Sequence, residues 1–189
     1  MLVAITGTPG SGKSHFARML ARRIPDAVII EINDVVDSKH AFSGYDEFSA
    51  KVVKLRPLSS AIIKEVGRNK GKLVILVGHL FPELAIRSDV CVVMRSGLRR
   101  LMKILSSRGY PPKKVSDNVI AEALDYCGTK AAERSAETYE IESFRDKQMI
   151  ISYISRIWNG KGGRRPAKNE ISKMGELHDL IKNGAIALD

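Results

Sequence analysis

Residues 7–14 read GTPGSGKS, which is a complete G-x-x-x-x-G-K-S loop. Glycines at this spacing, Gly7, Gly10 and Gly12, let the backbone turn tightly, so its N–H groups can approach phosphate oxygens. Lys13 can reach the β- and γ-phosphates of a nucleotide, and the Ser14 hydroxyl can coordinate Mg²⁺. The loop therefore predicts a binding site for a nucleoside triphosphate.

The residues around the loop support this interpretation. Four apolar residues at positions 2–5 run into the loop, and Phe16, Met19 and Leu20 follow it at helical spacing. The helix that opens near Lys13 adds its positive N-terminal end, which favours anions. A glycine-rich turn with an unrelated Lys-Ser pair would lack this flanking pattern. The residues expected to contact ATP are Gly10, Ser11, Gly12, Lys13, Ser14 and His15.

Two further candidate residues follow predicted strands. Asp34 comes just after the second strand, where it would contact an acceptor or the metal, or cap the helix that begins there. His79 follows the third strand, where it would position water or substrate beside the γ-phosphate, or serve only a structural role.

The net charge of +10 is concentrated in two basic runs. We expect the first to serve mostly the nucleotide, with Arg95 reaching the phosphate cavity and Arg99 and Arg100 on a solvated helix face. We expect the second to meet a polyanionic partner such as RNA, or to act only as a solubilising extension. The first run comprises Arg95, Arg99, Arg100, Lys103, Arg108, Lys113 and Lys114, and the second comprises Lys161, Arg164, Arg165 and Lys168.

Alternating strands and helices position these residues. The sequence predicts an α/β fold: a doubly wound, parallel five-stranded sheet with helices on both faces and ligands beyond the carboxyl ends of the strands. The predicted strands are residues 2–6, 27–32, 72–77, 89–94 and 138–142. The predicted helices are residues 13–23, 46–54, 58–69, 97–108, 115–137 and 146–158.

The chain length suits one core with a small appendage. Residues 1–158 are expected to form the main domain and residues 159–189 a basic linker with a short amphipathic helix, 171–182, that docks on the core. Cys91 and Cys127 fit neither a disulfide framework nor a metal-ligand spacing. No apolar run is long enough to cross a bilayer, so we expect no membrane contact and a cytoplasmic location.

Several short motifs follow the loop in a recognisable order. They lie at residues 44–47 (GYDE), 78–83 (GHLFPE), 93–96 (VMRS), 108–110 (RGY) and 116–118 (SDN). Together with the phosphate loop, over roughly residues 1–140, they resemble the adenylate-kinase-like proteins of the CINAP type, found in archaea and in eukaryotic nuclei.

The resemblance implies an adenylate kinase and ATPase that converts ATP and AMP into two ADP with Mg²⁺ and assists maturation of the small ribosomal subunit. It implies a nucleoside-monophosphate-binding segment at about 30–53 and a short lid at about 107–117. By the same resemblance, His79 is the catalytic histidine and Arg108 the lid arginine that closes over the phosphates of ATP. The implied partners are AMP and a small-subunit ribosomal protein or ribosomal RNA.

One position departs from the family pattern. Human-type members carry Asp two residues before the histidine, where this chain has Val77. Ser14, the phosphates, water and Asp34 are then left to hold the metal ion, and hydrolysis without a partner should be slow. Two other functions stay open. One is an ATP-switched assembly factor with secondary kinase activity, and the other is a small-molecule kinase with another acceptor.

Overall fold

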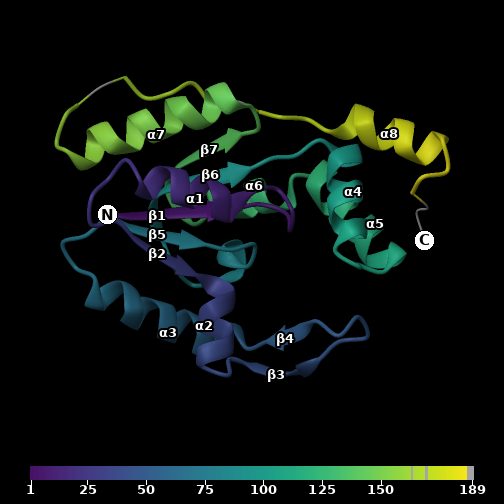
Figure 1. Ribbon diagram of the computed structural model, residues 1–189, viewed down its shortest axis with the longest axis horizontal. Helices are drawn as coiled ribbons and strands as arrows, with labels where there is room; N and C mark the ends of the chain where they lie inside the picture. Colours follow the sequence, from purple (N-terminus) through teal and green to yellow (C-terminus); the bar gives the residue numbers. More distant parts are fainter. Residues whose placement is uncertain (163, 169, 187–189) are drawn as a thin grey trace.

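The computed structural model describes residues 1–162, 164–168 and 170–186. A five-stranded parallel sheet has the order β2-β5-β1-β6-β7, so the strand that leads into the phosphate loop is central (Figure 1). Its strands are β1 (Leu2–Thr6), β2 (Val28–Glu31), β5 (Val74–Val77), β6 (Ser88–Met94) and β7 (Ser135–Ile141). The first four of these strands fall where the apolar runs predicted them, and β7 overlaps the strand predicted at 138–142. The predicted fold class is confirmed.

Helices cover both faces of the sheet. On one face, α1 (Lys13–Ala21) and α7 (Phe144–Trp158) bury Phe16, Leu20 and Ile154 against alternate strand residues. On the other face lie α2 (Ile32–Ser38), α3 (Leu55–Arg68), the 3-10 turn η1 (Phe81–Glu83) and α6 (Tyr126–Ala132). Because the strands of this sheet are all parallel, their carboxyl ends lie at the same edge, where the phosphate loop follows β1.

A third apolar cluster lies beside the sheet. It joins α4 (Leu98–Ser107) and α5 (Pro112–Ala123) to the C-terminal helix α8 (Met174–Lys182). From α8, Leu177 and Leu180 are buried in this cluster. The amphipathic tail helix predicted at 171–182 thus begins three residues later and docks on the core.

The predicted helix at 46–54 is wrong. The chain forms an antiparallel hairpin there, β3 (Phe42–Tyr45) and β4 (Lys51–Val53). Asp46 Oδ1 accepts the backbone N–H groups of Phe48 at 2.9 Å and Ala50 at 2.8 Å, and Ser49 adopts φ 57°. A side-chain carboxylate that captures nearby N–H groups favours a turn over a helix.

The predicted helix at 115–137 is also wrong, because the chain breaks in its middle. Asp125 adopts φ 53°, and its side chain accepts the N–H of Gly128 at 3.2 Å. This residue ends the path of α5 and starts α6 as its N-terminal cap. The last strand, β7, therefore begins at Ser135 rather than at position 138.

The basic linker is solvent-exposed where it is described: Lys161, Arg164, Arg165 and Lys168 all face water. Arg165 nevertheless pairs with Glu137 at 3.0 Å. Within the described ranges, no helix combines the length and apolar character needed to span a bilayer.

Candidate nucleotide-binding site

The phosphate loop is held in its shape by close packing. Gly7 has φ 130°, and a Cβ atom there would lie 2.4 Å from the Met94 carbonyl oxygen, so no larger residue fits. Gly12 caps α1 in a left-handed conformation, with φ 96°. The loop thus leads its N–H groups directly into the first turn of α1. The buried Ser11 hydroxyl has no hydrogen-bond partner among the described residues, which suits a loop that receives phosphate oxygens.

Lys13 lies across the loop. Its Nζ donates to the Gly7 and Thr8 carbonyl oxygens, both at 2.9 Å. Burial, with a smaller contribution from the Arg108 guanidinium, lowers the pKa of Lys13 to about 8. Cys127, Glu122 and Glu31 act in the opposite direction. The two carbonyl oxygens carry only partial negative charge, so a phosphate would be a stronger partner for the Lys13 ammonium than they are.

A cavity of about 350 Å³ lies at the phosphate loop and is lined by most of the predicted site residues. A separate cavity of about 440 Å³ lies beside β7 and contains none of them. Arg108 and Tyr110 reach the phosphate-loop cavity from the turn between α4 and α5, and His79 reaches it from the end of β5. Its lining consists of Pro9, Gly10, Gly12, Lys13, Ser14, His15, Arg18, Glu31, Asn33, Gly78, His79, Arg108 and Tyr110.

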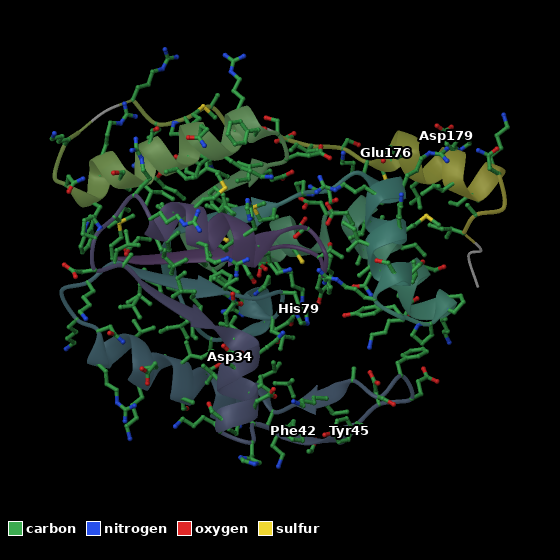
Figure 2. All side chains as sticks on the ribbon, in the orientation of Figure 1. Asp34, Phe42, Tyr45, His79, Glu176 and Asp179 are labelled. Carbon is green, nitrogen blue, oxygen red and sulfur yellow. The ribbon has the colours of Figure 1, made fainter. Side chains whose placement is uncertain are left out.

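His79 is a neutral imidazole in this setting. Burial, together with the positive charges of Lys13 and Lys114, lowers the pKa of His79 to about 4. Figure 2 shows the residue beside α2, on the side that faces α4 and α5. At neutral pH one of its ring nitrogens can therefore accept a hydrogen bond, which a protonated imidazolium could not do.

A second cavity of about 280 Å³ adjoins the first, and Asn33 and His79 line both. The remaining walls come from α2, from the β3–β4 hairpin and from Leu80; they are Val36, Asp37, Ala50, Lys51 and Val53. Behind the shared wall, a Cβ atom on Gly78 would lie 2.7 Å from the Cβ of Ile32, so α2 begins directly against the end of β5.

Asp34 lines neither cavity. It is exposed in the first turn of α2, one residue beyond Asn33, and it is not the helix cap, a position that Glu31 occupies (Figure 2). Sequence reasoning missed Glu31 and Asn33, which flank Ile32 at the carboxyl end of β2. Their position at the carboxyl end of a predicted strand, where ligands bind in this fold class, could have identified them as candidates.

The β3–β4 hairpin and the α4–α5 region approach each other through Lys114, which belongs to α5. The Lys114 ammonium lies 5.7 Å from the centre of the Phe48 ring and 5.3 Å from that of Tyr110. Phe48 belongs to the hairpin tip and Tyr110 to the turn after α4. This cation–π sandwich joins the two segments that the resemblance assigns to acceptor binding and to the lid.

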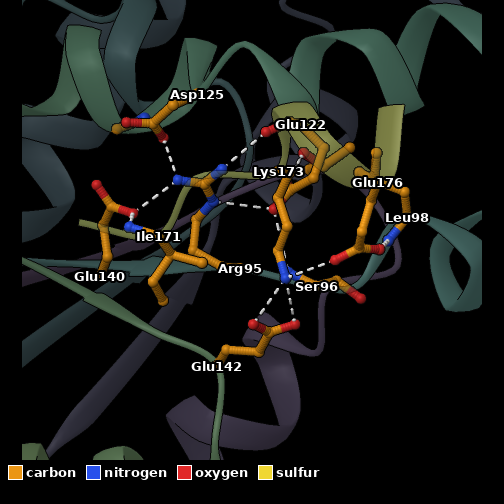
Figure 3. A network of polar contacts seen from close by, with 12 residues as sticks. Arg95, Ser96, Leu98, Glu122, Asp125, Glu140, Glu142, Ile171, Lys173 and Glu176 are labelled. Atoms are coloured by element: carbon orange, nitrogen blue, oxygen red, sulfur yellow. Dashed lines mark hydrogen bonds and ion pairs between the residues drawn. The ribbon is translucent and has the colours of Figure 1, made fainter. Parts of the chain in front are cut away.

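Arg95 does not reach the phosphate cavity, contrary to the prediction. Its side chain is 1% exposed and is held behind the loop by Glu122 at 2.9 Å, Asp125 at 2.8 Å and Glu140 at 2.7 Å (Figure 3). Burial acts to lower the pKa of Arg95, but the hydrogen bond and charge of Glu122 raise it above its ordinary value.

Glu122 connects this buried arginine to the phosphate loop. One of its oxygens accepts the Arg95 Nε hydrogen and the Ser96 N–H at 3.0 Å, and the other accepts the Thr8 hydroxyl. The carboxylate thus ties the loop to the end of β6 and to α5. Arg95 is a structural residue that supports the loop from behind.

The phosphate-loop cavity contains side chains that could hold the predicted Mg²⁺ ion. Ser14, Glu31 and Asn33 line one cavity and offer hydroxyl, carboxylate and amide oxygens, the hard donors that Mg²⁺ prefers. In the described part of the chain, no three His, Cys, Asp or Glu side chains cluster as a metal-binding group. A metal ion at this site would therefore take several of its ligands from phosphates and water.

Solved structures share the fold. A shikimate kinase from Acinetobacter baumannii, solved in complex with shikimate, matches with a TM-score of 0.55 and 13% identity over 86% of this chain and 95% of that chain. A shikimate kinase from Bacteroides thetaiotaomicron matches with a TM-score of 0.53 and 14% identity, covering 84% and 98%. At these identities the likeness concerns the fold alone.

Comparison with sequence relatives identifies the family as well as the fold. A family model described as an AAA domain matches residues 3–125. A Methanocaldococcus jannaschii protein named "Putative adenylate kinase" is 33% identical over 87% of this chain and 90% of its own length. A Methanococcus maripaludis protein of the same name is 33% identical over 96% and 100%. In Saccharomyces cerevisiae, "Adenylate kinase isoenzyme 6 homolog FAP7" is 29% identical over 82% and 79%. The chain therefore belongs to this family of adenylate-kinase-like P-loop proteins, as the order of its motifs predicted.

Proposed function

We propose that the chain transfers the terminal phosphoryl group of ATP to AMP and forms two ADP. The observation that carries this proposal is the pair of adjoining cavities that share Asn33 and His79. One cavity contains the phosphate loop, and the other lies under the hairpin of the segment expected to bind the monophosphate. The names of the archaeal relatives support the same activity.

The donor side is built for a triphosphate. Lys13 and the loop N–H groups would hold the β- and γ-phosphates, and Arg108 would offset charge on the moving phosphoryl group. Ser14, with Glu31 and Asn33 nearby, would hold Mg²⁺ through its own oxygen and through water. When bound, Mg²⁺ neutralises part of the phosphate charge.

In the transfer, a phosphate oxygen of AMP attacks the γ-phosphorus in line with the leaving group. The bond from the γ-phosphorus to the β–γ bridging oxygen breaks, and the leaving ADP takes both bonding electrons. His79 lies where the two cavities meet, so it would orient the acceptor or, without AMP, a water molecule. Asp34 stays a candidate acceptor contact. Because Val77 replaces the usual carboxylate, hydrolysis by the isolated protein should be slow.

The test measures ADP formed from ATP and AMP, beside ADP and phosphate formed from ATP alone. Lys13→Ala should lower AMP phosphorylation by about a hundred-fold or more, since it removes the cation at the transferred phosphate. Lys72→Ala is the matched control, because Lys72 is exposed before β5, at the opposite edge of the sheet. Absence of ADP formation from AMP by the native protein contradicts the proposal, and transfer to a different acceptor in the same assay identifies a different kinase.

A second candidate function rests on the exposed basic linker. Lys161, Arg164 and Lys168 would contact ribosomal RNA or an RNA-bound ribosomal protein, with ATP hydrolysis timing release. Replacing these three residues by Gln should weaken binding to ribosomal RNA and flatten its dependence on salt concentration, while AMP phosphorylation persists. Unchanged binding across a salt series would leave the linker as a solubilising extension.

A further inference from the structure

The C-terminal segment is joined to the core by a buried cation. The Lys173 side chain is 8% exposed, and its Nζ donates to the two carboxylate oxygens of Glu142 at 2.9 and 2.8 Å and to Glu176 at 3.1 Å (Figure 3). Glu142 follows β7 directly, at the edge of the sheet where the nucleotide site lies. A second contact, from the Ile171 N–H to Glu140 at 3.1 Å, extends the attachment.

Glu176 also completes a different helix. Its other oxygen accepts the backbone N–H of Leu98, the first residue of α4, at 2.8 Å. The residue before α4 is Gly97, which has no side chain to cap the helix. The carboxylate that serves this N-terminus therefore comes from 78 positions later in the sequence, and its negative charge suits the helix dipole.

The apolar face of α8 packs chiefly against α5, within the cluster that also contains the apolar side chains of α4. Leu177, Leu180 and Ile186 are buried in the cluster that contains Leu101 and Leu105. A carboxylate from α8 thus holds the start of α4 directly, and the packing of α8 on α5 supports the cluster that contains the middle of α4. Loss of the C-terminal segment would remove both contributions.

The same apolar face of α4 also contacts the phosphate loop. A Cβ atom on Gly10 would lie 3.2 Å from both Leu101 and Ile104 and 3.5 Å from Leu105, so the helix packs directly on the loop. The helix also ends at Arg108, which lines the nucleotide cavity. A shift of α4 would therefore move the loop support and the lid arginine together.

We infer that the segment 170–186 positions the nucleotide site through α4, with Glu176 and Lys173 as positioning residues. This inference rests on the proposed function for its effect on transfer, but its effect on ATP binding is measured separately. The loss of a helix cap of this kind should reduce the affinity for ATP by up to about five-fold, the full effect of a cap on helix stability.

The experiment compares three full-length variants by calorimetric titration with ATP and Mg²⁺, at a temperature where circular dichroism shows each to be folded. Glu176→Ala should weaken ATP binding and lower kcat for AMP phosphorylation. Glu176→Gln, which keeps an acceptor oxygen for Leu98, should restore most of the affinity. Asp179→Ala removes an exposed carboxylate from the same helix and should change neither quantity (Figure 2).

Native affinity in folded Glu176→Ala overturns the inference, as does an equal loss in Asp179→Ala. If Glu176→Ala does not fold, Lys173→Met provides the test, because it keeps the aliphatic stem and removes only the ion pairs. Native ATP affinity in folded Lys173→Met then overturns the inference, and weakened affinity supports it. Failure of AMP phosphorylation in the native protein would instead contradict the proposed function, while the binding comparison would still decide the role of the segment.

Discussion

Removal of the Glu122 carboxylate should destabilise the protein strongly. Glu122→Ala leaves three donors without their acceptor: Arg95 Nε, the Ser96 N–H and the Thr8 hydroxyl. Breaking a buried ion pair from one side costs about 3–5 kcal/mol, because the remaining charge stays desolvated. Arg95 retains Asp125 and Glu140, so we expect a loss near the lower end, about 3 kcal/mol.

The conservative variant separates charge from hydrogen bonding. In Glu122→Gln, the amide oxygen can still accept from Arg95 and Ser96, and the amide nitrogen can donate to Thr8. We expect that variant to lose about 1 kcal/mol, since the hydrogen bonds persist without the ionic contribution. For a chain of this size, 1 kcal/mol shifts Tm by about 2–4 °C, which gives about 6–12 °C for Ala and about 2–4 °C for Gln.

Thermal unfolding followed by circular dichroism measures both shifts. Glu133→Ala serves as the control, because Glu133 is exposed at the C-terminal end of α6. A Tm for Glu122→Ala within about 2 °C of the native value would refute the reasoning, since a shift that small is worth no more than about 1 kcal/mol. Equal losses in the Ala and Gln variants would show that charge alone matters.

Three further predictions concern the site. His79→Ala should lower kcat strongly with little change in ATP affinity, because the residue lies where the two cavities meet rather than over the phosphate loop. Steady-state kinetics and ATP titration measure the two quantities, and an unchanged kcat would give His79 a structural role. The folded pKa of His79 is about 4, below the ordinary 6.5, so stability should fall as pH drops from about 6.5 to 4; denaturant titrations should show less of this loss in His79→Gln. The pKa of Lys13 is about 8, and phosphates should raise it, so ATP binding near pH 9 should take up protons; heats measured in buffers of different ionisation enthalpy should differ for the native protein and agree for Lys13→Met.

The sheet and the phosphate loop could be predicted because their signals are local. Each central strand is a run of Val, Ile and Leu, and the glycines of the loop stand at fixed offsets from Lys13. His79 and Arg108 line the cavity because both lie at the ends of elements whose positions the sequence indicates.

The errors arose where long-range or side-chain contacts decide the structure. Nothing near Arg95 in the sequence indicates that Glu122 and Glu140, from two later elements, enclose it. The hairpin depends on Asp46 as an acceptor for backbone N–H groups, which helical spacing of apolar residues does not reveal. Asn33 and Lys51 form walls of one cavity only because the hairpin folds back over α2.

The tight fit of Gly78 against Ile32 has a consequence for motion. Because they pack without intervening space, we expect the start of α2 to stay in place relative to the sheet. At the other end of the helix, Ala41 is held by backbone hydrogen bonds, donating to Val36 at 2.9 Å and accepting from Lys54 at 2.9 Å. If the chain binds AMP as proposed, we therefore expect the rearrangement on binding to be confined to residues 42–53, with α2 as its fixed base.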